Sequence, residues 1–365
     1  MSEIPKPAML ATDWKQESGP LKPYLADKTV SEIMVNRWDR IFIERNGVIE
    51  EAEYKFQNAD ALTRFVQSLC ACLGRELNRR HPYLDARLPD GSRLNIVVPP
   101  VAFEGATITI RKTTMDCFRY QTLVQNGTLT DKAVYFLNQV VAAKQNLLIS
   151  GGTGSGKTTV LGVLSSFIGS KERVVSIEDT AELQISVRNL VRMETRTGLA
   201  NETTISTGDL LRNALRMRPN RILIGECRGA EALDMLMAMN TGHEGSMTTI
   251  HANTAKDALR RLESMVLQSG IEAPLSMVQA DIANTINIVV QVERRADGVR
   301  RVVEIIEVLG RKNDQYQFET IFHLDPNKGV VSTGYVPRFV EQNPAIKTKL
   351  SAPFFDPLCV PKLAA

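Results

Sequence analysis

Residues 151–158 read Gly-Gly-Thr-Gly-Ser-Gly-Lys-Thr and satisfy the pattern GxxxxGK[ST]. An apolar run at 146–149 precedes them, and a helical pattern follows from Lys157 to about residue 167. Glycines allow the backbone to curl so that successive N–H groups point at phosphate oxygens, where side chains would block the approach. The N-terminus of the following helix adds partial positive charge. The stretch therefore predicts a site for the phosphates of a nucleoside triphosphate.

Two side chains of this loop have expected roles beyond the backbone. Lys157 supplies a full charge between the β- and γ-phosphates, and the hydroxyl of Thr158 is expected to ligate Mg²⁺. The residues predicted to bind the nucleotide here are Gly151, Gly152, Thr153, Gly154, Ser155, Gly156, Lys157, Thr158 and Thr159.

Helical and strand patterns alternate on both sides of the loop. Helices are predicted at 131–143, 209–217, 230–239 and 255–266, and strands at 174–177, 221–224 and 246–250. Strands separated by helices imply a mainly parallel sheet with covered faces, so the fold class is α/β. The chain becomes β-rich again at 287–292, 301–309 and 316–322.

The part before the loop reads as a smaller α+β domain. Asn46-Gly47 between two β runs predicts a hairpin, because this pair accepts the positive φ of a tight turn. Apolar residues at helical spacing then predict a helix with Asp60 at its N-cap. The expected organisation is an arm at 1–20, this domain at 21–120, a linker at 121–129, the α/β domain at 130–340 and a tail at 341–365.

Composition narrows the classes of protein. The 44 Lys and Arg against 41 Asp and Glu leave a net charge of +3, which is too weak to favour nucleic-acid binding. No stretch approaches the ~20 apolar residues that cross a bilayer, and the first residues lack the apolar core of a signal peptide. Five scattered cysteines predict free thiols in a reducing compartment. We expect a cytoplasmic protein without a membrane span.

Acidic residues follow two of the predicted strands. Glu178-Asp179 comes after one and Gly225-Glu226 after the other, at the sheet edge where ligands of open α/β sheets bind. Gly225 stands where many phosphate-loop enzymes place an aspartate that coordinates Mg²⁺, so the work on water shifts to Glu226. Thr158, Glu178, Asp179 and Glu226 are the expected metal-handling residues.

Histidine and arginine supply the remaining candidates. His251 follows an apolar strand and is expected to touch the γ-phosphate or its water. The sequence does not predict a zinc site, because no third ligand lies at a suitable spacing from the histidines. Arg87, Arg93 and Arg111 flank the β-rich part of the first domain, either as a solvated face or as charges delivered to the γ-phosphate. The pairs at 79–80, 294–295 and 300–301 are expected on the surface.

Taken together, these motifs resemble the type II/type IV secretion ATPases. The carrying segments are the phosphate loop, the acidic box Ser176–Asp179, the segment Arg218–Arg228 and the histidine box Thr241–Asn253. Within that family the chain resembles the Tad (tight-adherence) pilus motors in Leu84–Arg93, Thr109–Lys112, Val191–Arg196, Glu231–Met235 and Thr333–Phe339. The similarity spans about residues 20–340.

The resemblance implies a cytoplasmic homohexamer whose protomers join a small N-terminal domain to a RecA-like domain, with ATP and Mg²⁺ between them. Hydrolysis would rotate the domains and move inner-membrane platform proteins that assemble or retract a pilus. By this analogy Glu226 is catalytic, Glu178 supports metal and water, and Arg93 and Arg111, with Arg87, face the phosphates. Arg192 and Arg196 become candidates for a neighbouring protomer's site.

Two other functions fit a RecA-like sheet. One is a nucleic-acid motor or conjugative translocation ATPase, which the weak net charge and the 6% aromatic content disfavour. The other is a nucleotide-gated scaffold without steady-state turnover. We expect no nucleic-acid partner.

Overall fold

The computed structural model describes residues 14–15, 18–45, 47–112, 119–196, 203–313 and 315–357. The chain divides into two compact units, Met1–Asp116 and Cys117–Ala365, and each is described by itself. Of the expected arm at 1–20, residues 1–13 and 16–17 lie outside the described residues. Trp14, within that segment, is buried in the core of the first unit.

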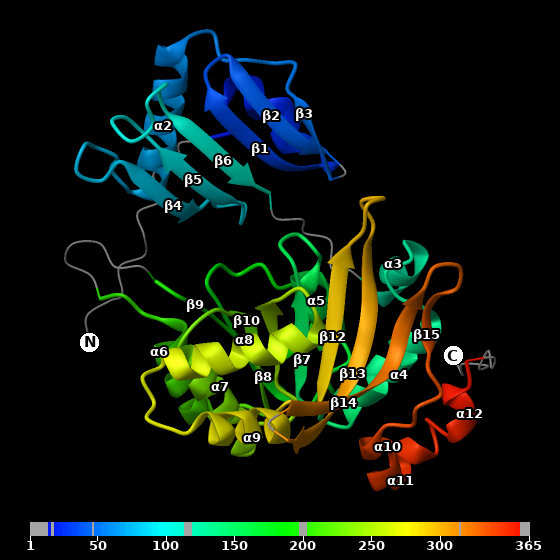
Figure 1. Ribbon diagram of the computed structural model, residues 1–365. Coiled ribbons are helices and arrows are strands. Elements are labelled where there is room, and N and C mark those ends of the chain that lie inside the picture. The colour runs from blue at the N-terminus through cyan, green and yellow to red at the C-terminus, as the bar shows by residue number, and fades with distance from the viewer. Residues whose placement is uncertain are drawn as a thin grey trace. The chain divides into compact units, whose positions relative to one another are not determined.

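The first unit is an antiparallel sheet with helices (Figure 1). Its sheet has the order β3-β2-β1-β6-β5-β4, and every neighbouring pair is antiparallel. The elements are η1 (Gly19–Leu21), α1 (Lys22–Ala26), β1 (Val30–Arg37), β2 (Arg40–Arg45), β3 (Val48–Glu51), α2 (Ala59–Leu73), β4 (Tyr83–Arg87), β5 (Arg93–Val97) and β6 (Thr107–Arg111).

Helix α2 packs its apolar stripe into the core of this unit. Leu62, Phe65 and Leu69 are buried there together with alternate residues of the strands, so the α+β expectation is confirmed. The expected N-cap, Asp60, is wrong. The helix begins two residues earlier, at Ala59, and the side chain of its N-cap Asn58 accepts the N–H of Ala61 at 2.9 Å.

The second unit contains a nine-stranded sheet in the order β15-β14-β13-β12-β7-β11-β10-β8-β9. From β12 to β9 all neighbours are parallel, and β12 to β15 form an antiparallel extension. The strands are β7 (Leu147–Gly151), β8 (Arg173–Glu178), β9 (Asn189–Glu194), β10 (Arg221–Cys227), β11 (Met247–His251), β12 (Ile288–Arg294), β13 (Arg300–Lys312), β14 (Gln315–Asp325) and β15 (Gly329–Ser332). The expected α/β fold class with a mainly parallel sheet is confirmed.

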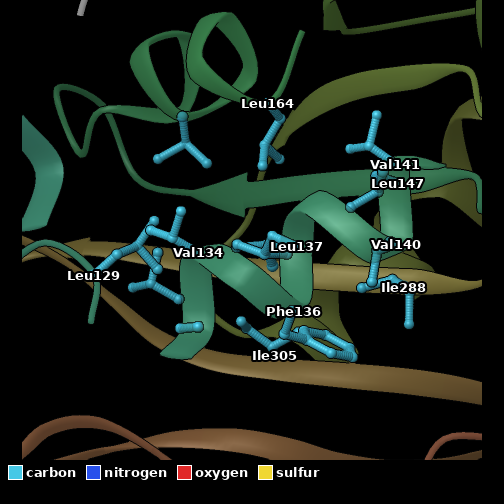
Figure 2. Close-up of a cluster of buried hydrophobic side chains, with 14 of the residues drawn as sticks. Leu129, Val134, Phe136, Leu137, Val140, Val141, Leu147, Leu164, Ile288 and Ile305 are labelled. Atoms are coloured by element: carbon cyan, nitrogen blue, oxygen red, sulfur yellow. The ribbon is translucent and has the colours of Figure 1, made fainter. Parts of the chain in front are cut away.

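Helices cover both faces of this sheet (Figure 1). One core gathers α4 and α5 with alternate strand residues, and Figure 2 shows α4 side chains together with Leu147, Leu164 and Ile288. The other core gathers α6 to α9. The helices are α3 (Tyr120–Gln125), α4 (Asp131–Ala142), α5 (Lys157–Ser165), α6 (Thr207–Ala214), η2 (Leu215–Met217), α7 (Glu231–Asn240), α8 (Ala255–Gln268) and α9 (Leu275–Thr285).

The end of the chain differs from the expected tail at 341–365. Helices α10 (Arg338–Gln342), α11 (Pro344–Lys347) and α12 (Ala352–Phe355) carry buried residues of the α4 core, including Phe354 and Phe355. Pro344 and Pro353 stand in the first turns of α11 and α12, where a missing N–H costs nothing. Residues 358–365 lie outside the described residues. None of the helices that the structure describes combines the length and the apolarity needed to cross a bilayer.

A buried arginine ties the base of the second sheet together. Arg221, at the start of β10, is 1% exposed. Its Nε and Nη2 donate to the carboxylate of Glu172 at 2.7 and 2.8 Å, and its Nη1 donates to the carbonyls of Val141 and Gly245. This fork satisfies acceptors from three segments that converge at one point.

Replacement of Arg221 with Ala should lower the free energy of unfolding by roughly 3–5 kcal/mol, because it leaves the Glu172 charge without its partner. Glu172→Gln should cost less, since it removes that charge and keeps an acceptor. Exposed Arg216→Ala is the matched control and should change stability by about 0.5 kcal/mol or less. Urea unfolding of the three variants measures this, and equal losses at Arg221 and Arg216 would contradict it.

The candidate nucleotide site of the second unit

The carboxyl ends of four parallel strands meet at one edge of the second sheet. Gly151 of β7 is in register with His251 of β11 and with Val292 of β12. Cys227 of β10 pairs with Ile250, next to His251, and β8 ends alongside at Glu178. The predicted phosphate loop, the two acidic segments and the histidine therefore share one edge, as the sequence predicted.

The glycines of the loop are required by its geometry. A Cβ on Gly151 would lie 2.3 Å from the carbonyl oxygen of Val292, so the loop begins in direct contact with β12. Gly154 and Gly156 have φ of 67° and 97°, which L side chains rarely adopt. Helix α5 starts at the next residue, Lys157. Strand, curled loop and helix stand in the order that suits phosphate binding.

Lys157 folds back on its own loop. Its Nζ donates to the carbonyls of Gly151 and Gly152 at 3.0 and 2.8 Å, and the side chain is buried. Burial lowers the pKa of Lys157, while the charge of Glu226 opposes this effect. The ammonium group is thus held at the mouth of the loop by two acceptors.

Glu226 lies on an irregular part of β10. The pairing of β10 with β11 shifts between Ile224 and Cys227, and the hydroxyl of Thr249 holds the carbonyl of Gly225 at 2.7 Å. The strand continues one residue past the acid, to Cys227, although the sequence suggested an end at 224. A bulge at this point re-aims one side chain at the edge of the sheet.

The position before Glu226 is tight for the aspartate found in many phosphate-loop enzymes. A Cβ on Gly225 would lie 3.0 Å from Cγ of Glu178, tighter than ordinary contact. The buried Glu178 side chain therefore covers the Gly225 backbone. A longer side chain at residue 225 would have to displace Glu178.

Arg228 links the two acidic segments. Its Nε and Nη2 donate to Oε2 of Glu226 at 2.9 and 2.6 Å, and its Nη1 donates to Oδ2 of Asp179 at 3.1 Å. Sequence reasoning missed this residue because it ended the strand at 224. Arg228 directly follows Cys227, the last residue of β10, and its place two residues after Glu226 was the available signal.

Glu178 is used to shape the loop after β8. Its Oε2 accepts the N–H groups of Glu182 and Leu183, each at 2.7 Å, and its Oε1 lies 3.7 Å from Nη2 of Arg192. Burial raises the pKa of Glu178, against the opposing effect of the N–H groups of Leu183 and Glu182. Oε1 is buried and makes no hydrogen bond within the part of the chain that the structure describes.

His251 ends β11 beside the loop and is half-buried. The turn that follows it is anchored from β12, where Nε2 of Gln291 donates to the carbonyl of Asn253 at 2.9 Å. Among the described residues, no group of three His, Cys, Asp or Glu side chains is arranged to hold a metal ion.

The donors fit a magnesium ion that is completed by phosphates and water. Mg²⁺ in nucleotide sites takes one or two protein oxygens and keeps several waters. Thr158 stands in the first turn of α5, and Asp179 and Glu226 stand at the same sheet edge. The carboxylates of Asp179 and Glu226 both form ion pairs with Arg228, so the protein would supply only part of the ligand shell of the metal ion.

In the first unit, the three arginine candidates fall in one cross-strand row. Arg87 pairs with Arg93, and Arg93 pairs with Arg111. The row continues through Glu32 to Glu44, so the arginines lie at one end of the row and the carboxylates at the other. Directly opposed like charges destabilise a sheet by a few tenths of a kcal/mol or more. Three adjacent arginines therefore favour a nearby anion.

Arg192 and Arg196 bond within their own unit. Nη2 of Arg192 donates to the carbonyl of Leu183 at 2.8 Å, and Nη2 of Arg196 donates to that of Thr203 at 3.3 Å. These contacts brace the segments beside β8 and β9.

Substitution of Glu178 separates its structural role from its charge. Glu178→Ala should lower the free energy of unfolding by about 2–4 kcal/mol, because two buried N–H groups lose their acceptor. Glu178→Gln keeps an acceptor and should lose less. Because the pKa of Glu178 is raised in the folded state, the stability of the wild type relative to the Glu178→Gln variant should fall as the pH rises above 4.5. Urea titrations between pH 4 and 8 measure both effects, and a difference that grows in favour of the wild type would contradict the second.

Comparisons with known proteins agree with this geometry. The family model described as "Type II/IV secretion system protein" matches residues 14–319. The conjugal transfer protein TrbB of Rhizobium radiobacter is 35% identical over 312 residues, which cover 84% of this chain and 92% of TrbB. The type IV secretion system protein PtlH of Bordetella pertussis is 36% identical over 316 residues, which cover 78% of this chain and 92% of PtlH.

Solved structures share the fold. The ATPase DotB of Yersinia pseudotuberculosis matches with a TM-score of 0.58 at 19% identity, covering 86% of this chain and 83% of DotB. The pilus retraction motor PilT with bound ADP matches with a TM-score of 0.55 at 19% identity, covering 80% and 79%. Because the family model spans most of the sequence and full-length relatives exceed 30% identity, this chain belongs to the family of type II/IV secretion system proteins.

Proposed function

We propose that this protein is a motor ATPase that hydrolyses ATP with Mg²⁺ to drive a secretion or pilus machine. The observation that carries the proposal is the single sheet edge that joins the phosphate loop, Lys157 and the Glu226–Arg228–Asp179 network. Family membership and the ATPases among proteins of this fold support it.

The proposed reaction is the transfer of the γ-phosphoryl group to water. Glu226 holds the attacking water; as the new P–O bond forms, the bond to the β–γ bridging oxygen breaks and its electron pair stays on ADP. The water's protons end on solvent and phosphate. Lys157 leaves the carbonyls of Gly151 and Gly152 to meet the phosphates. Mg²⁺, held by Thr158 and through water by Asp179 and Glu226, would supply charge neutralisation.

We further propose that Arg93 and Arg111, with Arg87, meet the phosphates from the first unit. The cross-strand row gathers three positive charges on one side, which supports an anionic partner. Loss of the γ-phosphate would then remove a charge-assisted clamp and shift the population between closed and open states. ATP hydrolysis in the second unit would thereby drive movement of the first unit. His251 is proposed as the sensor of the γ-phosphate.

We also propose which secretion or pilus system this ATPase drives. The motifs at Leu84–Arg93 and Thr333–Phe339 favour Tad-type pili, with a homohexamer in the cytoplasm that works on inner-membrane platform proteins. The conjugal transfer protein TrbB among the relatives favours a second candidate, a motor of a conjugative type IV secretion system. Stimulation of ATP hydrolysis by single-stranded DNA with strong salt dependence would favour direct work on nucleic acid over both.

Two variants test the chemistry. Lys157→Ala should abolish nucleotide binding or turnover, because the loop loses its full positive charge. Glu226→Gln should bind ATP within about threefold of the wild type while kcat falls at least 10²-fold. Phosphate release and equilibrium binding of a fluorescent ATP analogue measure the two quantities separately. Normal turnover by Glu226→Gln would contradict the catalytic assignment.

Arg228 should act by orienting Glu226. Arg228→Ala removes both hydrogen bonds to Oε2, and we expect kcat to fall about 10–10²-fold with ATP binding little changed. Arg228→Lys should recover part of the rate. Arg216→Ala provides the exposed control, and faster hydrolysis in Arg228→Ala would show that the contact restrains the enzyme instead.

A further inference from the structure

The β12–β13 hairpin lies against the phosphate loop. Pairing of β12 with β7 runs up to Val292 opposite Gly151, where β7 ends. The hairpin continues beyond that point to the pair Arg294 and Arg300, and Figure 1 shows both strands extending past the end of β7. Arg300, the first residue of β13, therefore lies next to the phosphate loop.

Arg300 touches two glycines of the loop. Its Nε donates to the carbonyl oxygen of Gly154 at 2.9 Å. Its methylene carbons pack over Gly156, where an added Cβ would lie 3.0 Å from Cδ of Arg300 and 3.8 Å from its Cβ. Although Arg300 is exposed, as expected for this arginine pair, it also makes a specific contact with the loop.

The hydrogen bond fixes one peptide plane of the loop. In a trans peptide the carbonyl of Gly154 and the N–H of Ser155 point to opposite sides. A donor that holds the carbonyl of Gly154 therefore sets the direction of the N–H of Ser155, which makes a long hydrogen bond of 3.4 Å to the carbonyl of Gly152. A cationic donor also polarises the peptide and strengthens that N–H as a donor. Because Gly154 and Gly156 have no side chain, their own backbone can adopt other conformations at little cost, so a contact from outside the loop helps to select one.

We propose that Arg300 is a positioning residue for the nucleotide, which braces the phosphate loop from the β12–β13 hairpin so that its N–H groups face the phosphates. This inference rests on the proposed nucleotide-binding function. Arg300 lies outside the four motifs of the sequence analysis, which are the phosphate loop, the acidic box Ser176–Asp179, the segment Arg218–Arg228 and the histidine box Thr241–Asn253. The role is exerted through the loop backbone, so it should change nucleotide affinity and leave the chemical step alone.

The neighbouring residue supplies a matched control. Nη1 of Arg301 forms an ion pair with Oδ2 of Asp297 at 2.6 Å, within the turn of the same hairpin. Arg301→Ala removes an arginine from the same strand end with the same change in net charge. It leaves the Arg300 contact with Gly154 in place.

The test is the dissociation constant of fluorescently labelled ADP with Mg²⁺, measured on the full chain. Arg300→Met keeps the methylene packing and removes the donor, and Arg300→Ala removes both. We expect both to raise Kd about tenfold, Arg300→Lys to stay within threefold of the wild type, and Arg301→Ala within twofold. In ATP hydrolysis the Met variant should raise KM with kcat unchanged within twofold, and its melting temperature without nucleotide should equal that of the wild type.

Two results would overturn the inference. One is binding by Arg300→Met within twofold of the wild type; the other is an equal loss in Arg301→Ala. If either occurs while Lys157→Ala abolishes binding, the proposed function stands and the role of Arg300 does not. A wild-type protein that binds no nucleotide would remove the proposed function, and the inference with it. A lowered melting temperature without nucleotide would assign Arg300 to folding instead.

Discussion

The site depends on one constraint, the parallel alignment of strand ends against the phosphate loop. Gly151 must end β7 without a side chain because the carbonyl of Val292 occupies the space beside it. That same register fixes His251 on one side and the β12–β13 hairpin on the other. The loop is therefore held by its neighbours in the sheet as much as by its own glycines.

Charge at this edge is organised around Arg228. It neutralises Glu226 and Asp179 together, while Glu178, although also acidic, is buried and serves two backbone N–H groups. Since the Glu178 side chain covers Gly225, an aspartate before Glu226 would require Glu178 to shift. The departure from the common phosphate-loop pattern thus agrees with the packing at this position, and in the proposed mechanism Glu226 is the carboxylate that acts on water.

Much of the fold and the edge of the site could be predicted because their signals are local. The glycine loop, the apolar strands and the helical stripes each depend on neighbours in sequence, and strand β7, helix α5 and strand β8 lie close to their expected positions. What was missed depends on distant partners. Strand β9 is an edge strand without alternating burial. The segment expected as a tail contains α11 and α12, which pack their apolar residues against the distant helix α4. Arg300 contacts a loop nearly 150 residues away, which no local pattern reveals.

The central claim is that a triphosphate bound by the second unit also acts on the arginines of the first. The most direct measurement is the distance between one fluorescent label on each unit, followed on adding MgATP and during its conversion to MgADP. The account predicts a distance that changes with ATP and returns with ADP, and a change that is lost when Arg93 and Arg111 are both replaced with Ala although ATP still binds. The same distance in both nucleotide states of the wild type, or an undiminished change in the double variant, would contradict it.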